Sequence, residues 1–156
     1  MAHTQSSPRG IMTDPSLDKV YNVDFAVGPG KPNNKDDVQL VQLFLQQIYS
    51  HSTLGAGPLP DGKKIDTDGV CGPITKSAIW HLQTYLQRVS GGQVYADGVV
   101  SPVPLGDELG PHMPSLIWMN WLLQEAIGRG RFITLQIDSI TPSPLRTSLP
   151  RSYYWY

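Results

Sequence analysis

The acidic and histidine side chains offer the first chemical possibility in this chain, which is to hold a metal ion. Asp66, Asp68 and Gly69 have the spacing of part of a calcium-binding loop. In that alignment Lys64 and Thr75 stand where the loop needs carboxylates, so the match fails. The histidines show neither an H-x-x-x-H nor an H-x-x-E spacing; they are His3, His51, His81 and His112. The sequence therefore predicts no metal site, and it implies no cofactor.

Side chains that could do catalysis are not arranged for it either. A glycosidase needs two carboxyl groups, one of them with a raised pKa. The glutamates are Glu108 and Glu125, and nothing in the sequence places either of them beside an aspartate. No G-x-S-x-G motif occurs, and the single cysteine, Cys71, has no neighbouring His or Lys that would activate its thiol. We predict that the protein is not an enzyme and that Cys71 is a small packed residue.

The composition describes a globular chain with many turns. Of its 156 residues 40% are hydrophobic, enough for a core, and 14 Pro and 15 Gly indicate a high turn content. The net charge is -1 without a Lys/Arg block, so nucleic-acid binding is not expected. No run reaches the ~18 apolar residues of a membrane span. Residues 1–13 lack the apolar segment of a classical signal peptide, so we expect a cytoplasmic protein or one delivered to the periplasm or cell wall by a specialised route.

Three helices are predicted from apolar spacing and end signals. The first follows Asn33 or Asn34 as its cap and runs to about residue 49. The second covers residues 73–89, because Gly72 and Pro73 suit its start and the glycines after Ser90 suit its end. The third runs from about residue 114 to 128. The buried face of the second helix is expected to comprise Ile74, Ala78, Leu82, Tyr85, Leu86 and Val89, and that of the first Val38, Leu40, Val41, Phe44, Leu45 and Ile48.

Two short strands are predicted outside these helices, one within residues 20–27 and one within residues 131–140. The flanking segments are rich in Pro, Ser and Thr at the start and in Pro and aromatic residues at the end. We therefore divide the chain into a mobile arm (1–18), one domain (19–140) and a tail (141–156).

The most specific pattern in the chain is D-G-x-x-G-P-x-T-x-x-A-x-x-x-L-Q over residues 68–83. A V-x-x-V-Q-x-x-L pattern precedes it at residues 38–45, and a second Asp-Gly turn follows within residues 96–102. Together these resemble the peptidoglycan-binding-like domain family, a small three-helix module of bacterial wall enzymes. The resemblance implies a mainly α fold, a three-helix bundle to which the N- and C-terminal extensions add a small β part. The long connection at 50–64 and Ser101, where the family has glycine, depart from it.

The resemblance also implies a function, which is noncatalytic recognition of peptidoglycan. The residues expected to bind it lie around the start of the second helix and the second Asp-Gly turn; they are Asp68, Thr75, Trp80, Gln83, Tyr95 and Asp97. A structural explanation stands beside this one, in which Asp68 forms the turn, Thr75 closes the first turn of the helix and Gln83 bonds backbone. Trp80 is either exposed for stacking on a sugar or covered by extra chain such as residues 131–156.

A second hypothesis makes the chain an adaptor or structural subunit of a phage tail, secretion apparatus or toxin complex. The third helix is apolar nearly all round, so either the terminal additions or another subunit must cover it. The residues expected to contact a protein partner, or a second copy of the chain, are Trp118, Trp121, Tyr153, Tyr154 and Trp155.

Overall fold

A computed structural model describes residues 3–6, 19–51, 59, 62–103 and 113–149, and the protein is mainly helical. In chain order the elements are β1 (His3–Ser6), β2 (Lys19–Asn22), α1 (Lys35–Ser50), α2 (Pro73–Val89), α3 (Ser115–Ile127), α4 (Arg129–Ile133), the 3-10 helix η2 (Leu135–Ile137) and α5 (Ser143–Ser148).

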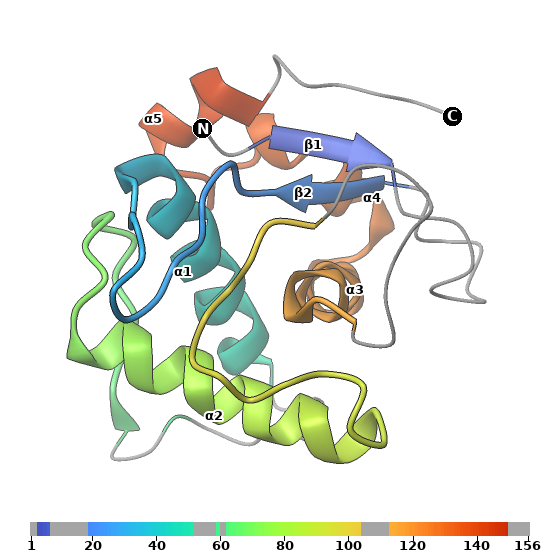
Figure 1. Ribbon diagram of the computed structural model, residues 1–156. Coiled ribbons are helices and arrows are strands. Elements are labelled where there is room, and N and C mark those ends of the chain that lie inside the picture. Colours follow the sequence, from blue (N-terminus) through green and yellow to red (C-terminus); the bar gives the residue numbers. More distant parts are fainter. Residues whose placement is uncertain (1–2, 7–18, 52–58, 60–61, 104–112, 150–156) are drawn as a thin grey trace.

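Helix α1 lies at the centre of the fold. It packs against α2, α3 and α5, and α2 also contacts α3. Figure 1 shows α2 crossing on one side of α1, while the two strands and α5 lie on the other. The apolar face predicted for this helix is confirmed, because all six of its residues are buried: Val38, Leu40, Val41, Phe44, Leu45 and Ile48. Every residue from Asp37 to Leu45 is buried, so the core surrounds the first half of this helix rather than covering one face of it.

The start of α1 differs from the prediction in its hydrogen bonding. Asn34 is the N-cap residue, but its side chain makes no capping hydrogen bond. Asn33 instead closes the preceding loop, since its Oδ1 accepts the Gly28 N–H at 2.8 Å and its Nδ2 donates to the Gly28 C=O at 2.9 Å. The predicted position of the cap is therefore confirmed at Asn34, but the capping hydrogen bond typical of an asparagine is not formed.

Asp37, in the first turn of α1, carries a buried carboxylate. Its two oxygens accept the backbone N–H groups of Asp24 and Phe25, each at 3.1 Å. Burial raises the pKa of Asp37, and these hydrogen bonds act in the opposite direction. The side chain thus ties the segment after β2 to the central helix.

The strands form one antiparallel pair, with His3 opposite Asn22. Strand β2 is attached to α3 by Asn120, whose Oδ1 accepts the Tyr21 N–H at 2.6 Å and whose Nδ2 donates to the Tyr21 C=O at 2.9 Å. The strand predicted within residues 20–27 is therefore shorter than expected, since regular pairing ends at Asn22.

Helix α2 begins and ends where the sequence places it, at Pro73 and Val89. Its buried face is nevertheless rotated from the expected one. Ile74 is 42% exposed and Val89 is 47% exposed, so both were wrongly assigned to the core. Ile74 lies outside the buried stripe, which uses Ile79 instead. Val89 is the last residue of the helix, where burial has ended.

The strand predicted within residues 131–140 is wrong, because these residues lie in α4 and η2. Gly128 ends α3 with a φ of 88°, and its C=O accepts the Phe132 N–H at 3.0 Å, which starts a new helical turn. Phe132 and Leu135 are buried three residues apart, a helical spacing, whereas Ile137 is 72% exposed. Within the described residues, the C-terminal extension thus adds helices, and the β part is N-terminal.

Parts of both predicted terminal segments pack on the domain. Strand β1 belongs to residues 1–18 and pairs with β2. Helix α5 belongs to residues 141–156, contacts α1 and buries Leu145. The aromatic residues Tyr153, Tyr154 and Trp155 lie outside the described residues. None of the helices in the described part has both the length and the apolar character that crossing a bilayer requires.

Candidate binding site

The two Asp-Gly turns have the same local structure. In the first, Asp68 Oδ1 accepts the Val70 N–H at 3.0 Å. In the second, Asp97 Oδ1 accepts the Val99 N–H at 2.9 Å. The glycines between them have φ of 77° (Gly69) and 78° (Gly98), a left-handed conformation that only glycine adopts at no steric cost. The Asp-Gly pairs are therefore turn residues in both places.

A buried glutamine from the preceding helix holds each turn. In the first, Gln42 of α1 accepts the Gly69 N–H on Oε1 at 2.9 Å and donates from Nε2 to the Val70 C=O at 2.9 Å. Its Nε2 also lies 2.9 Å from Asp68 Oδ1 and 3.1 Å from Thr75 Oγ1. We call this pair of contacts to one turn, through Oε1 and Nε2, an amide clamp.

The second amide clamp repeats the first. Gln83 of α2 accepts the Gly98 N–H on Oε1 at 2.8 Å and donates from Nε2 to the Val99 C=O at 2.7 Å. The same Nε2 lies 3.2 Å from the Oγ of Ser115, the first residue of α3. Each clamp thus joins a helix, the turn that follows it and the first turn of the next helix.

The burial of the expected ligand-binding residues divides them into two groups. Thr75 is 4% exposed and Gln83 is 2% exposed, and the polar atoms of both side chains form hydrogen bonds inside the molecule. Asp68 and Asp97 are exposed, but each uses one carboxylate oxygen in its own turn. These contacts favour the structural explanation for Thr75 and Gln83, which can reach a ligand only by releasing a turn.

The first turn also determines the charge state of Asp68. The hydrogen bond from the Val70 N–H and the one from the Gln42 side chain lower its pKa from the ordinary aspartate value. Both contacts are made to Oδ1, and they favour the ionised form of this carboxylate.

Trp80 and Tyr95 form the second group, because both side chains reach solvent. Trp80 is 54% exposed and Tyr95 is 49% exposed. The side chain of Thr84, one helical turn further along α2, donates to the Trp80 C=O at 2.9 Å. Residues 131–149 therefore leave Trp80 largely uncovered, so of the two possibilities for this tryptophan the structure supports the exposed one.

The chain after α2 turns back and runs along that helix, as Figure 1 shows. The Val94 N–H bonds Ser90 Oγ at 3.1 Å, and further on the Gly98 N–H reaches Gln83. The returning segment therefore passes the last two turns of α2 in the opposite direction. Tyr95 lies between these two attachments, which places it on the side of α2 that Gln83 faces.

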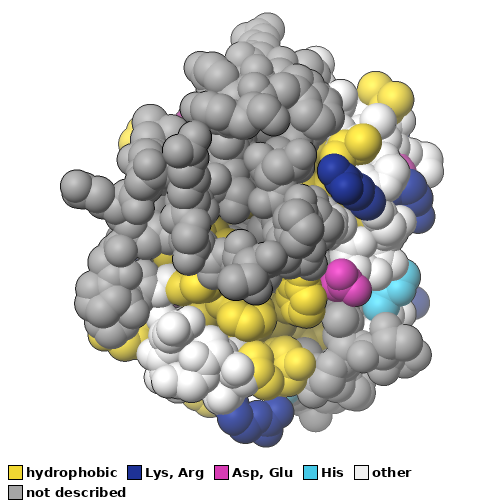
Figure 2. All heavy atoms as spheres, turned by 90° about the vertical axis from the view of Figure 1, so that its right-hand side faces the viewer, with side chains coloured by type: hydrophobic (Ala, Val, Ile, Leu, Met, Phe, Trp, Pro, Cys, Tyr) yellow, Lys and Arg dark blue, Asp and Glu magenta, His cyan; other side chains and the backbone are white. Residues whose placement is uncertain are grey.

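Trp118 and Trp121 occupy a different environment on α3. Both are half-buried and pack against the core, and their rings meet edge to face with centroids 6.0 Å apart. Figure 2 shows hydrophobic side chains gathered on the face that carries α3 and the C-terminal end of α2. The residues expected to meet a protein partner thus contribute partly to the core.

The remaining reactive side chains have structural contacts. Tyr49 Oη and His81 Nδ1 are 2.9 Å apart, and the rings stack with centroids 5.8 Å apart. Burial raises the pKa of Tyr49 and that of the half-buried Cys71 thiol, which is the opposite of activation. Within the described residues, no group of three His, Cys, Asp or Glu side chains is placed to share a metal ion.

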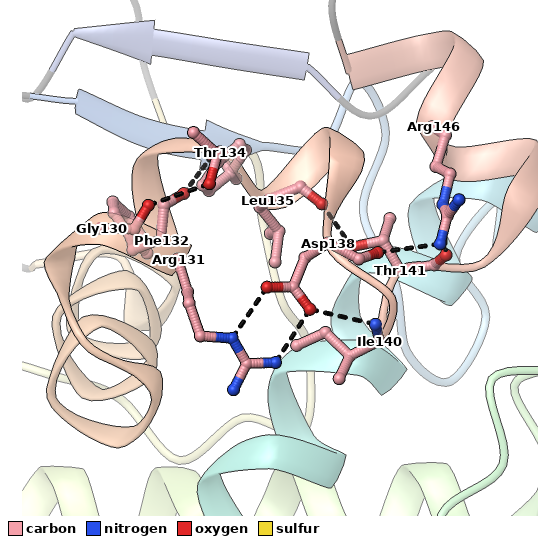
Figure 3. Close-up of polar contacts among 10 residues, drawn as sticks. Gly130, Arg131, Phe132, Thr134, Leu135, Asp138, Ile140, Thr141 and Arg146 are labelled. Carbon is pink, nitrogen blue, oxygen red and sulfur yellow. Dashed lines mark hydrogen bonds and ion pairs between the residues drawn. The ribbon is translucent and has the colours of Figure 1, made fainter.

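A cluster of polar contacts within residues 131–146 was not predicted from the sequence (Figure 3). Arg131 of α4 forms a two-pronged ion pair with Asp138, with both N–O distances at 2.8 Å. Arg146 of α5 donates to the backbone carbonyls of Asp138 and Thr141, each at 2.9 Å. The Arg131 guanidinium lowers the pKa of Asp138 to about 2. The cluster joins α4, η2 and α5, so we assign it a structural role.

No protein-family model, curated protein or solved structure matches this chain. The family resemblance therefore depends on the motif residues and on the turns that they build.

Proposed function

We propose that this chain is a noncatalytic module that binds peptidoglycan, with the three-helix bundle of the peptidoglycan-binding-like family. The observation that carries the proposal is the pair of amide clamps. The motif resemblance supplies the two Asp-Gly turns and the glutamines, and each glutamine contacts the turn that follows it through the same two atoms. The second turn keeps this geometry although Ser101 replaces the family's glycine.

The exposed side chains of this region supply the binding surface. Trp80 and Tyr95 project from α2 and from the segment that returns along it. A large aromatic side chain offers a rigid apolar surface together with a polar edge, which suits a ligand that is partly apolar and partly hydrogen-bonding. The buried clamps hold this surface and are not themselves contact groups.

Co-sedimentation with purified sacculi tests the proposal. We expect the protein to pellet with sacculi at physiological salt and to lose most of this retention on Trp80→Ala. Ile74→Ala is the matched control, because Ile74 is an exposed apolar residue of the same helix on a different side. If Trp80→Ala leaves the retention unchanged, Trp80 is not part of the binding surface. If the parent protein is not retained on sacculi even at low salt, the proposed peptidoglycan binding is wrong.

The alternative function is an adaptor or structural subunit that uses the same fold for protein contacts. The hydrophobic side chains that gather on the face in Figure 2 favour it, because a contiguous exposed apolar patch is typical of a protein contact surface. Sedimentation velocity separates the two functions. A stable oligomer together with no retention on sacculi supports the adaptor, whereas a monomer that pellets with sacculi supports the wall module.

A further inference from the structure

Most of the polar side chains expected to bind peptidoglycan form hydrogen bonds within the two turns and their clamps. Gln83 and Thr75 are buried, and Asp68 and Asp97 each commit one oxygen to a turn. Among the six expected residues, the exposed aromatic side chains are Trp80 and Tyr95. The recognition chemistry that these two offer is the packing of a ring face on an indole and a phenol.

The surroundings of Trp80 narrow the class of ligand. Its exposed neighbours one helical turn away are Lys76, Ser77 and Thr84, and Gln87 follows on the same side. The indole is thus surrounded by the ammonium group of Lys76 and by hydroxyl and amide groups, without other exposed large apolar side chains among these neighbours. A pyranose ring matches this arrangement, because its axial C–H groups form an apolar face and its hydroxyls project around the edge.

The position of Tyr95 argues for an extended ligand. Its segment is attached to α2 at the level of Ser90 and of Gln83. At 1.5 Å per residue, Tyr95 therefore lies about 5–15 Å along the helix axis from Trp80. Tyr95 lies on the side of α2 that Gln83 faces, and Gln83 is about 60° around the helix axis from Trp80. Two aromatic side chains spaced in this way along a helix suit an oligosaccharide rather than a single sugar.

The balance of charges around Trp80 and Tyr95 disfavours the stem peptide of the wall as the ligand. Such peptides carry several carboxylates, which call for a surplus of cations. Among the exposed neighbours of Trp80 named above, Lys76 is the one cation, and the exposed Asp97 of the returning segment carries the opposite charge. A neutral chain of N-acetylhexosamines needs no such surplus.

We infer that the ligand is the glycan strand, lying along α2 over Trp80 and Tyr95, and not the stem peptide. This inference rests on the proposed wall-binding function and names the part of the wall that is bound. Trp80 supplies the main stacking surface because it is the larger ring, and Tyr95 supplies a second contact.

Titration calorimetry with two soluble probes tests the inference, using the full chain, chitohexaose and isolated stem peptide. We expect chitohexaose to bind and the peptide not to bind. Trp80→Ala should weaken chitohexaose binding about tenfold or more and Tyr95→Ala about threefold, with Ile74→Ala unchanged. Trp80→Phe keeps a smaller ring and should retain part of the affinity, so a folding defect in Trp80→Ala cannot be mistaken for a lost contact.

The outcomes separate the two proposals. Retention on sacculi with binding of the peptide, or with no binding of chitohexaose, overturns the glycan assignment and leaves the wall-binding function standing. Chitohexaose binding that is equal in Trp80→Ala, Trp80→Phe and the parent protein also overturns the assignment. The absence of binding to sacculi and to both probes overturns both proposals.

Discussion

The two Asp-Gly turns share their clamps but differ in their other supports. Around the second turn, Val100 forms two backbone hydrogen bonds with Val27, at 2.8 and 3.0 Å, and Gly28 packs closely against Gly98. The first turn has no isolated strand bridge of this kind among the described residues. It leads directly through Gly72 into α2.

This difference shows how one local motif can be stabilised in two ways. The first turn is held by side chains of α1: Gln42, which also reaches Thr75 of the following helix, and Gln39, whose Nε2 donates to the Thr67 C=O at 3.2 Å. The second turn is held both by Gln83 and by the backbone hydrogen bonds between Val100 and Val27. We therefore expect the first turn to be more sensitive to loss of its clamp glutamine, and the second to be the more rigid support for Tyr95.

The largest effect is expected from removing the clamps. Gln42→Ala leaves the Gly69 N–H and the Val70 C=O without their partner, and we expect it to lower the free energy of unfolding by about 2–4 kcal/mol. Gln83→Ala should cost about 1 kcal/mol less, because the Val27–Val100 bridge remains. Chemical denaturation measures both, with Gln87→Ala as an exposed control on α2. Equal losses in the two clamp variants would contradict the proposed difference.

A smaller loss of stability is expected from replacing either of the turn glycines, Gly69 and Gly98, by alanine. Alanine at either position is strained by a similar positive φ, at about 1–2 kcal/mol. A Cβ on Gly98 would meet no atom within 4 Å, whereas one on Gly69 would lie 2.5 Å from Lys35 Cγ and 3.1 Å from the Lys35 C=O. Gly69→Ala should therefore destabilise the protein more than Gly98→Ala in thermal unfolding. The reverse order would show that the contact with α1 is looser than described.

The smallest effect is expected from the charge of Asp68. Its pKa is lowered in the folded protein, so the stabilisation is present above the unfolded value of about 3.9 and is lost as the pH falls through the folded value. Asp68→Asn should slightly lower the free energy of unfolding at pH 7. Below pH 4, the free energy of unfolding of the variant should fall less steeply with pH than that of the parent protein. Denaturation midpoints between pH 7 and pH 2.5 measure this. If the stability of the variant decreases below pH 4 as steeply as that of the parent protein, other carboxylates cause the loss of stability at low pH.

The sequence predicted the long helices well, because their signals are local. Pro73 and the glycines after Ser90 mark the ends of α2, and the apolar spacing in α1 marks its buried face. The strand at residues 131–140 failed because alternating apolar residues over a short run are compatible with helical turns once Phe132 and Leu135 face the core.

The clamps were harder to predict because they connect distant positions. Gln42 lies 28 residues before Val70, and Gln83 lies 16 residues before Val99. For Gln83 the sequence offered a hydrogen bond to backbone as one explanation, which the contacts with Gly98 and Val99 bear out. Unequal loops hide its equivalence to Gln42, for which no such role was predicted. The signal that existed was the position of each glutamine in a helix followed by an Asp-Gly pair. The roles expected of Trp80 and Tyr95 stay predictions, and the structure shows only that both side chains are exposed.

The most direct test of the account is a titration of ¹⁵N-labelled protein with soluble wall fragments, followed through the indole N–H resonances. Trp80 lies on the exposed side of α2, whereas Trp118 and Trp121 pack against the core. The account predicts that the Trp80 resonance shifts in a saturable way while those of Trp118 and Trp121 stay in place. A shift confined to Trp118 and Trp121, or no shift at all in a folded protein, would contradict it.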